Sequence, residues 1–140
     1  MTPLERLKAS PDFVRQTEPV DIAEAEALVG HALPDDLRDL LSTCAEFRAF
    51  FGENYFWLNP VREFIEINTN ADIRECYPGQ LIFASSGGGE YYALNTTVAP
   101  PRYAVVPAIG GPEDAIDQGP SLNHLLERLE QDRLFDEPPE

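Results

Sequence analysis

The chain has 140 residues, and its 25 acidic residues outnumber its 10 basic ones, so its formal net charge is −15. Phosphate backbones and anionic lipid surfaces repel such a molecule, which argues against nucleic acid and membranes as partners. A basic protein is the partner that this charge attracts, although acidity can also serve solubility alone. The length fits one domain with its own hydrophobic core.

Targeting signals are not expected, so the sequence predicts a soluble, cytoplasmic protein. Residues 1–10 mix charges with leucines and lack the apolar core of a signal peptide, and no apolar run is long enough to span a bilayer. Cys44 and Cys76 do not form a metal-binding pattern with other cysteines or histidines. We expect both to be reduced, partly buried thiols.

Residues 1–20 form an N-terminal arm, in which Leu4 and Leu7 share one face of a short amphipathic piece before Pro11 and Pro19. This pattern fits either a loosely docked helix or an extended lead-in. The sequence alone leaves open whether the arm packs on the rest of the chain.

Two helices are predicted after the arm. Asp21 is a good N-cap, Glu24 completes a capping box, and Gly30 suits the position just after a helix end. Pro34 fits the first turn of the second helix, because the N–H that proline lacks has no partner there. The apolar stripe of this second helix predicts an end within residues 45–49.

Short strands separated by turn residues follow. They are predicted at residues 50–51, 55–58, 81–84, 90–95 and 103–106. Segment 64–67 fits either a strand or a helical turn, and the polar segment 69–76 is compatible with a helix. Residues 110–119 are interpreted as an acidic loop, and Ser121 caps a last helix with leucines on one face.

This order of elements favours an α+β fold, because the strands are not interleaved with crossover helices. We expect a twisted antiparallel sheet of about four to six strands with two N-terminal helices and one C-terminal helix. The predicted single domain covers residues 21–134. Residues 135–140 are expected to form an acidic, mobile tail.

Four segments carry a family resemblance. The first is a helix pair joined by Gly-x-x-Leu-Pro at 26–37, and the second is a Leu-x-Pro-x-x-Glu segment at 58–64. The third is an apolar strand before a glycine-rich turn at 81–90, and the last is a closing leucine helix that begins at Ser121. In this order they resemble the SUKH superfamily, in its SMI/KNR-like branch, over residues 21–129. Ser85, Ser86 and Asn95 depart from the acidic residues that the family often has, so partner-binding residues are not carried over.

The resemblance implies an α+β domain with a twisted antiparallel sheet and flanking helices. Bacterial members of the superfamily are commonly immunity proteins encoded beside polymorphic toxins, many of them nucleases. Eukaryotic relatives are interaction modules in cell-wall and signalling regulation. The resemblance therefore implies a role in protein binding.

Catalytic patterns are weak in this sequence. Gly87–Gly89 is followed by Glu90 and not by the lysine of a phosphate-binding loop. His31 and His124 lack a nucleophile motif and are expected to be structural, and residues 113–117 lack the ligand spacing of a calcium loop. We expect no enzyme, no cofactor and no metal.

Acidic residues and neighbouring tyrosines are the predicted partner-binding residues: Glu53, Tyr55, Glu90, Tyr91, Glu113, Asp114 and Asp117. On a regular strand Tyr91 and Tyr92 point to opposite faces, so one of them is a candidate interface anchor. The aromatic residues could equally pack within the sheet and core.

The leading hypothesis is an immunity protein that neutralises a basic toxin domain, encoded nearby, through complementary charge. One alternative is an intracellular regulatory scaffold. Another, from a different class, is a hydrolase that uses a pair of carboxylates in one pocket. We expect a monomer, with a dimer as the alternative.

Overall fold

Seven antiparallel strands form a single sheet in the computed structural model, which describes residues 1–136. Each strand pairs with its neighbours in sequence, so the spatial order is the chain order. The strands are β1 (Val14–Arg15), β2 (Cys44–Phe51), β3 (Asn54–Leu58), β4 (Gln80–Ser85), β5 (Glu90–Asn95), β6 (Arg102–Pro107) and β7 (Ile116–Gly119).

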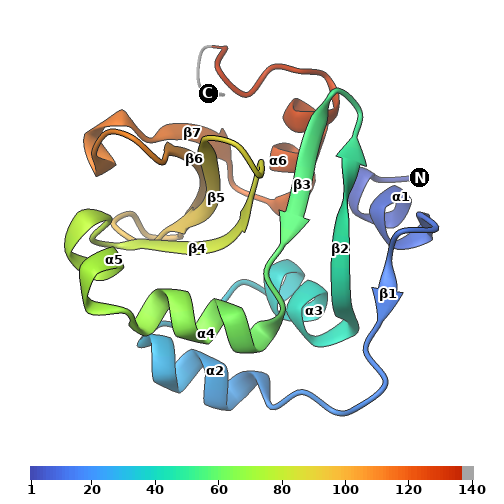
Figure 1. Cartoon of the computed structure of the whole chain (residues 1–140), viewed down its shortest axis with the longest axis horizontal. Helices are drawn as coiled ribbons and strands as arrows, with labels where there is room; N and C mark the ends of the chain where they lie inside the picture. The colour runs from blue at the N-terminus through green and yellow to red at the C-terminus, as the bar shows by residue number, and fades with distance from the viewer. Residues whose placement is uncertain (137–140) are drawn as a thin grey trace.

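Six α-helices flank this sheet within the described residues (Figure 1). They are α1 (Pro3–Ala9), α2 (Ile22–Val29), α3 (Asp35–Thr43), α4 (Val61–Thr69), α5 (Ala71–Cys76) and α6 (Leu122–Glu130), with a 3-10 turn η1 (Pro112–Asp114). The α+β class and the antiparallel sheet are confirmed. The sheet has one strand more than the predicted upper limit, and α1, α4 and α5 add to the three predicted helices.

The predicted N-cap and terminal glycine of the first helix are present, but the Glu24 side-chain bond that would complete the predicted capping box is not found in the described residues. Asp21 accepts a hydrogen bond from the Glu24 backbone N–H at 3.1 Å, and Gly30 ends α2 with a φ of 81°. Glu26 then accepts from the backbone N–H of Leu33 at 2.7 Å, which fixes the joint between α2 and α3. Pro34 is the N-cap of α3 and lies one position before the first turn predicted for it.

The prediction for the end of this second helix is wrong, because β2 already begins at Cys44. Residues 47–51 pair in register with residues 54–58 of β3, and this hairpin outweighs the helical pattern that continues past Thr43. Phe47 and Phe51 point into the core, whereas Arg48 and Phe50 point outward. The strand therefore has a buried and an exposed face, and its apolar residues also fit the helical spacing that led to the wrong prediction.

The central segment that the sequence left undecided is helical. Asn68 explains how α4 is attached to the sheet, because its buried side chain donates to the Ile82 carbonyl at 2.8 Å and accepts from the Ile82 N–H at 2.9 Å. Asn70 caps α5 by accepting from the Ile73 N–H at 3.1 Å. α4 lies beside α2 on one side of the molecule (Figure 1).

The predicted acidic loop 110–119 contains a strand that sequence analysis missed. Residues 116–119 form β7, in which Ile116 pairs with Val105 and Asp117 with Ala104 of β6. This strand has no alternating apolar pattern of its own. Residues 116–119 become a strand because they pair with β6, which is a contact between separate segments of the chain.

Two hydrophobic clusters lie on opposite faces of the sheet. The main cluster includes Phe83, Tyr92 and Val105 together with residues of α1, α3 and α6. The second contains Ile82 and Val106 with residues of α4 and α5. Successive residues of a strand point to opposite faces, so helices cover β4, β5 and β6 on both sides.

The N-terminal arm is docked through α1. Leu7 is fully buried in the main cluster, the Leu4 N–H donates to Asn123 Oδ1 at 2.9 Å, and Arg6 pairs with Glu130. At the other end Asp136 pairs with Arg133. The rest of the predicted tail, residues 137–140, lies outside the described residues.

Candidate protein-binding surface

The predicted acidic binding residues are separated in the structure, and several are engaged within the chain. Arg102 donates two hydrogen bonds to Asp117, at 2.9 and 2.8 Å. Asp114 accepts from the Gly111 N–H at 3.1 Å, and Glu90 accepts from the Ser86 hydroxyl at 2.8 Å. Glu53 is exposed in the turn between β2 and β3, and Glu113 is exposed in η1.

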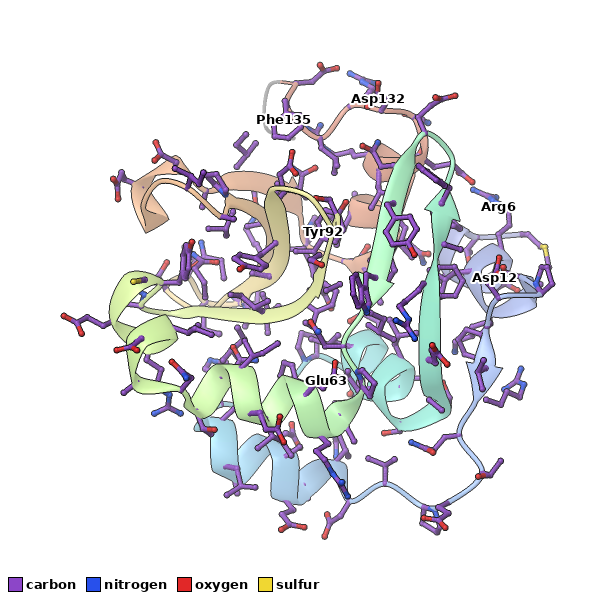
Figure 2. The ribbon with its side chains drawn as sticks, viewed as in Figure 1. Arg6, Asp12, Glu63, Tyr92, Asp132 and Phe135 are labelled. Carbon is purple, nitrogen blue, oxygen red and sulfur yellow. The ribbon has the colours of Figure 1, made fainter. Side chains whose placement is uncertain are left out.

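Tyr91 and Tyr92 point to opposite faces, as predicted. Tyr92 is fully buried, stacks on Phe56 with ring centroids 5.5 Å apart, and donates to the Tyr55 carbonyl at 3.0 Å (Figure 2). Burial raises the pKa of Tyr92 well above its usual range. Tyr91 is half-buried and packs edge-to-face on Tyr77 at 5.9 Å, so part of its ring is occupied by the second cluster.

An exposed aromatic surface lies instead on the outward side of β2 and β3, and we name it the hairpin face. Its members are Glu46, Arg48 and Phe50 of β2 and Tyr55 and Trp57 of β3. Phe50 is 70% exposed and Trp57 38%. The second cluster under α4 and α5 does not include this part of the outward face.

Cross-strand pairing organises the hairpin face. Phe50 lies opposite Tyr55 with ring centroids 5.3 Å apart, and Arg48 lies opposite Trp57 with its guanidinium carbon 5.2 Å from the ring centroid. Of these aromatic residues, only Tyr55 was predicted to bind a partner. Alternation along the strand could have identified Phe50 and Trp57, but only after the two strands and their buried faces were known.

Open hollows flank this face. One of about 300 Å³ is bordered by Glu46, Trp57 and Glu63, and one of about 450 Å³ by Asp12, Val14 and Tyr55. Arg48 borders both. Figure 2 shows Glu63 at the start of α4, beside the end of β3. A third, of about 290 Å³, lies between Trp57 and the glycine-rich loop.

The glycine-rich loop forms a rim beside the hairpin face. Ser86 Oγ accepts from the N–H groups of Gly88 and Gly89 at 3.3 Å each. Gly87 has a φ of 79°, and a Cβ there would lie 3.4 Å from the Tyr55 ring. The loop therefore packs closely on the face and is folded by its own serine, with no phosphate-binding lysine.

Comparison with known proteins agrees with this architecture. Residues 17–128 match the sequence model of the SMI1 / KNR4 family (SUKH-1). The chain belongs to this family. The matched residues include β2, β3 and the glycine-rich loop, and exclude α1. A comparison with curated proteins found no match.

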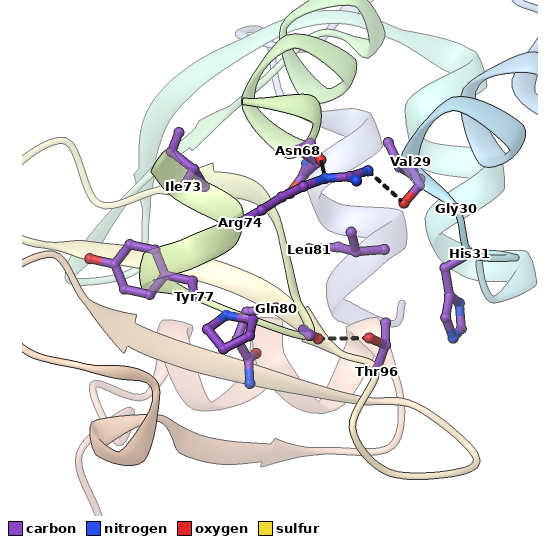
Figure 3. A pocket seen from close by; sticks show the side chains of 12 residues that line it. Val29, Gly30, His31, Asn68, Ile73, Arg74, Tyr77, Gln80, Leu81 and Thr96 are labelled. Atoms are coloured by element: carbon purple, nitrogen blue, oxygen red, sulfur yellow. Dashed lines mark hydrogen bonds between the residues drawn. The ribbon is translucent and has the colours of Figure 1, made fainter. Parts of the chain in front are cut away.

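This SUKH-1 domain also has a hollow of about 310 Å³ on another side, between α2, α5 and the start of β4 (Figure 3). Arg74 closes one wall by donating to the carbonyls of Asn68 at 2.6 Å and Val29 at 3.3 Å. The other polar groups at this hollow include His31 and Gln80, and none of the described residues that line it has a carboxylate. The paired acids that the hydrolase alternative requires are therefore not found at this hollow.

The two thiols of the SUKH-1 domain differ from one another. Cys44 is buried at the start of β2, and burial raises the pKa of its thiol to about 11. Cys76 is exposed, so the expectation of partial burial is wrong for it. Within residues 1–136 no group of three or more His, Cys, Asp or Glu side chains could hold a metal ion, and no helix is long and apolar enough to cross a membrane.

Proposed function

We propose that this SUKH-1 domain is a non-enzymatic immunity protein that binds and neutralises a basic toxin domain encoded nearby. The observation that carries the proposal is the hairpin face, where Phe50, Tyr55 and Trp57 are accessible on a rigid sheet and acidic side chains surround them. Carboxylates would steer a basic surface toward this face, and aromatic residues would anchor it. In this proposal the domain acts in the cytoplasm as a monomer.

Aromatic anchors matter because a few hot-spot residues supply most of the binding energy of a typical interface. Trp and Tyr are enriched among hot spots, and truncating such a residue costs about 2 kcal/mol or more of binding energy. Phe50 and Tyr55 already contact one another edge-to-face, so their rings are held in place before binding. This pre-ordering reduces the entropy lost on association.

The proposed binding site keeps Tyr55 of the residues predicted from the sequence but not the acidic residues of segment 110–119. Asp117 already has its guanidinium partner in Arg102, and Asp114 is occupied with the loop backbone. Glu46 and Glu63 instead border a hollow next to an exposed indole. Glu46 also has a guanidinium partner, Arg48, but that pair is 50% and 47% exposed, against 31% for each side chain of the Arg102–Asp117 pair. Glu63 adds a second carboxylate at the same hollow, so this side supports binding of a cationic surface better than the loop does.

The test is co-expression of the tagged domain with the protein encoded beside its gene. A one-to-one complex that weakens with salt and abolishes the neighbour's toxicity would support the proposal. Trp57→Ala should weaken that complex by about tenfold or more. Ile109→Ala is the matched control, since Ile109 is 95% exposed in the loop after β6 and should leave affinity unchanged.

Absence of both a complex and growth rescue would reject neutralisation of that neighbour. The regulatory scaffold would then become the leading function, because the hairpin face would serve equally for a basic cellular partner. A search for that partner would use Trp57→Ala as the negative control.

A further inference from the structure

Arg48 lies in a cradle on the hairpin face. Its guanidinium is over the Trp57 ring, 5.2 Å from the centroid, and its Nε donates to Glu46 Oε1 at 3.0 Å. Glu63 borders the same hollow from α4, and its charge contributes, after the larger effect of Glu46, to raising the pKa of Arg48. An indole face with two carboxylates is a complete receptor for a guanidinium.

The resident arginine is weakly held. The side chains of Arg48 and Glu46 are 50% and 47% exposed, so water competes with their ion pair. Glu46 precedes Arg48 by two residues on one strand. Among the described residues that border the two adjoining hollows, Arg48 is the only basic one. Those hollows are bordered by three carboxylates, Asp12, Glu46 and Glu63. The site therefore retains excess negative charge with Arg48 in place.

We propose that the cradle of Glu46, Trp57 and Glu63 is an arginine-recognition site, and that Arg48 occupies it until an arginine side chain of the partner replaces it. This inference rests on the proposed function and names the chemistry of the partner. A guanidinium is favoured over an ammonium because it is planar, stacks on an indole and donates several hydrogen bonds to carboxylates. The displaced Arg48 side chain has room in the open hollow that Asp12 and Tyr55 also border.

The site can be tested without any partner protein. Trp57 is the single tryptophan of the chain, so its indole N–H gives one side-chain resonance in an ¹⁵N-labelled sample. This resonance is followed while the peptide acetyl-Arg-Arg-amide is added at low salt. The neutral isostere acetyl-citrulline-citrulline-amide is added in a parallel series.

Removal of the resident arginine is the decisive change. For Arg48→Ala, the concentration of arginine peptide at the midpoint of the titration should be about threefold or more lower than for the unchanged protein. The reason is that the exposed Arg48–Glu46 ion pair no longer competes with the peptide. Arg133→Ala is the control for net charge, because Arg133 pairs with Asp136 and borders neither hollow. It should behave like the unchanged protein. Adding Glu46→Gln to Arg48→Ala should abolish the gain.

Equal midpoints for Arg48→Ala and Arg133→Ala would overturn the inference, because only net charge would then be at work. Equal responses to the arginine and citrulline peptides would also overturn it. Neither result would affect the proposed function, which depends on complex formation with the neighbouring protein. Conversely, arginine binding without such a complex would leave the site in place and reject only that neighbour.

Discussion

Tyr103 on β6 donates a hydrogen bond of 2.6 Å to Oδ1 of Asp36 on α3. The other carboxylate oxygen of Asp36 accepts from the Leu122 N–H at the start of α6, at 2.8 Å. The Asp36 side chain on α3 is therefore bonded both to β6 and to the start of α6. Burial and the neighbouring Asp36 carboxylate raise the pKa of Tyr103 far above its usual range, so the phenol remains a donor.

Tyr103→Phe should lower the free energy of unfolding by about 1–3 kcal/mol, because a part-buried hydrogen bond to a charged group is lost. Urea denaturation measures this change. Tyr91→Phe is the matched control, since the Tyr91 ring is half-buried and no hydrogen bond of its hydroxyl is found in the described residues. If both variants unfold at the same urea concentration, Asp36 does not hold the elements together as described.

Asn68→Ala is expected to be more damaging. It removes two hydrogen bonds to the backbone of Ile82 and leaves a buried N–H and carbonyl without partners, which costs about 2–5 kcal/mol. Thr69→Ala changes the exposed neighbouring residue on α4 and should shift stability by about 0.5 kcal/mol or less. A small effect of Asn68→Ala would mean that α4 is held to β4 by apolar packing alone.

Local signals and non-local contacts explain what the sequence could predict. The ends of α2 and α6 were predictable because Asp21, Gly30 and Ser121 act on the backbone within a few residues. The start of β2 pairs with Val14 and Arg15 of the N-terminal arm, and β7 pairs with β6 across an irregular segment, so neither is apparent from the local pattern.

The candidate site was harder to predict for the same reason. Trp57 and Phe50 are accessible because the outward face of β2 and β3 is left open, whereas Tyr91 on β5 is half-buried against the second cluster. Asp117 looked available in sequence, but Arg102 lies beside it on the neighbouring strand. The sequence shows which residues are charged or aromatic. Which of these side chains are exposed, and which carboxylates already have a basic partner, is known only from the fold.

Leu7→Ala tests whether the N-terminal arm belongs to the core. Leu7 is fully buried although it precedes residues 17–128 that match the family. Its truncation should cost about 2–4 kcal/mol of unfolding free energy, as for other buried leucines. Leu4→Ala should lower the free energy of unfolding by less, because Leu4 is only partly buried. If Leu7→Ala changed stability by only about 0.5 kcal/mol, α1 would be a detachable segment.

Thiol labelling should separate the two cysteines. The pKa of about 11 for Cys44 leaves almost no thiolate at pH 8 in the folded protein, and burial also blocks access. Cys76 is exposed and should react rapidly with a disulfide reagent such as DTNB. The expected result is one fast thiol per folded chain and two after unfolding. Two fast thiols in the folded protein would show that the start of β2 opens readily.

Charge reversal should locate the binding face once a partner is in hand. Glu46→Lys on the hairpin face should slow association by about tenfold at low salt, because steering by surface charge is lost where the partner docks. Asp117→Asn removes a carboxylate from the β6–β7 side, away from the hairpin face, and should leave the association rate nearly unchanged while slightly lowering stability through loss of the Arg102 pair. Stopped-flow kinetics at two salt concentrations distinguish the two effects. A larger effect of Asp117→Asn would move the binding face from the aromatic hairpin to the acidic segment after β6.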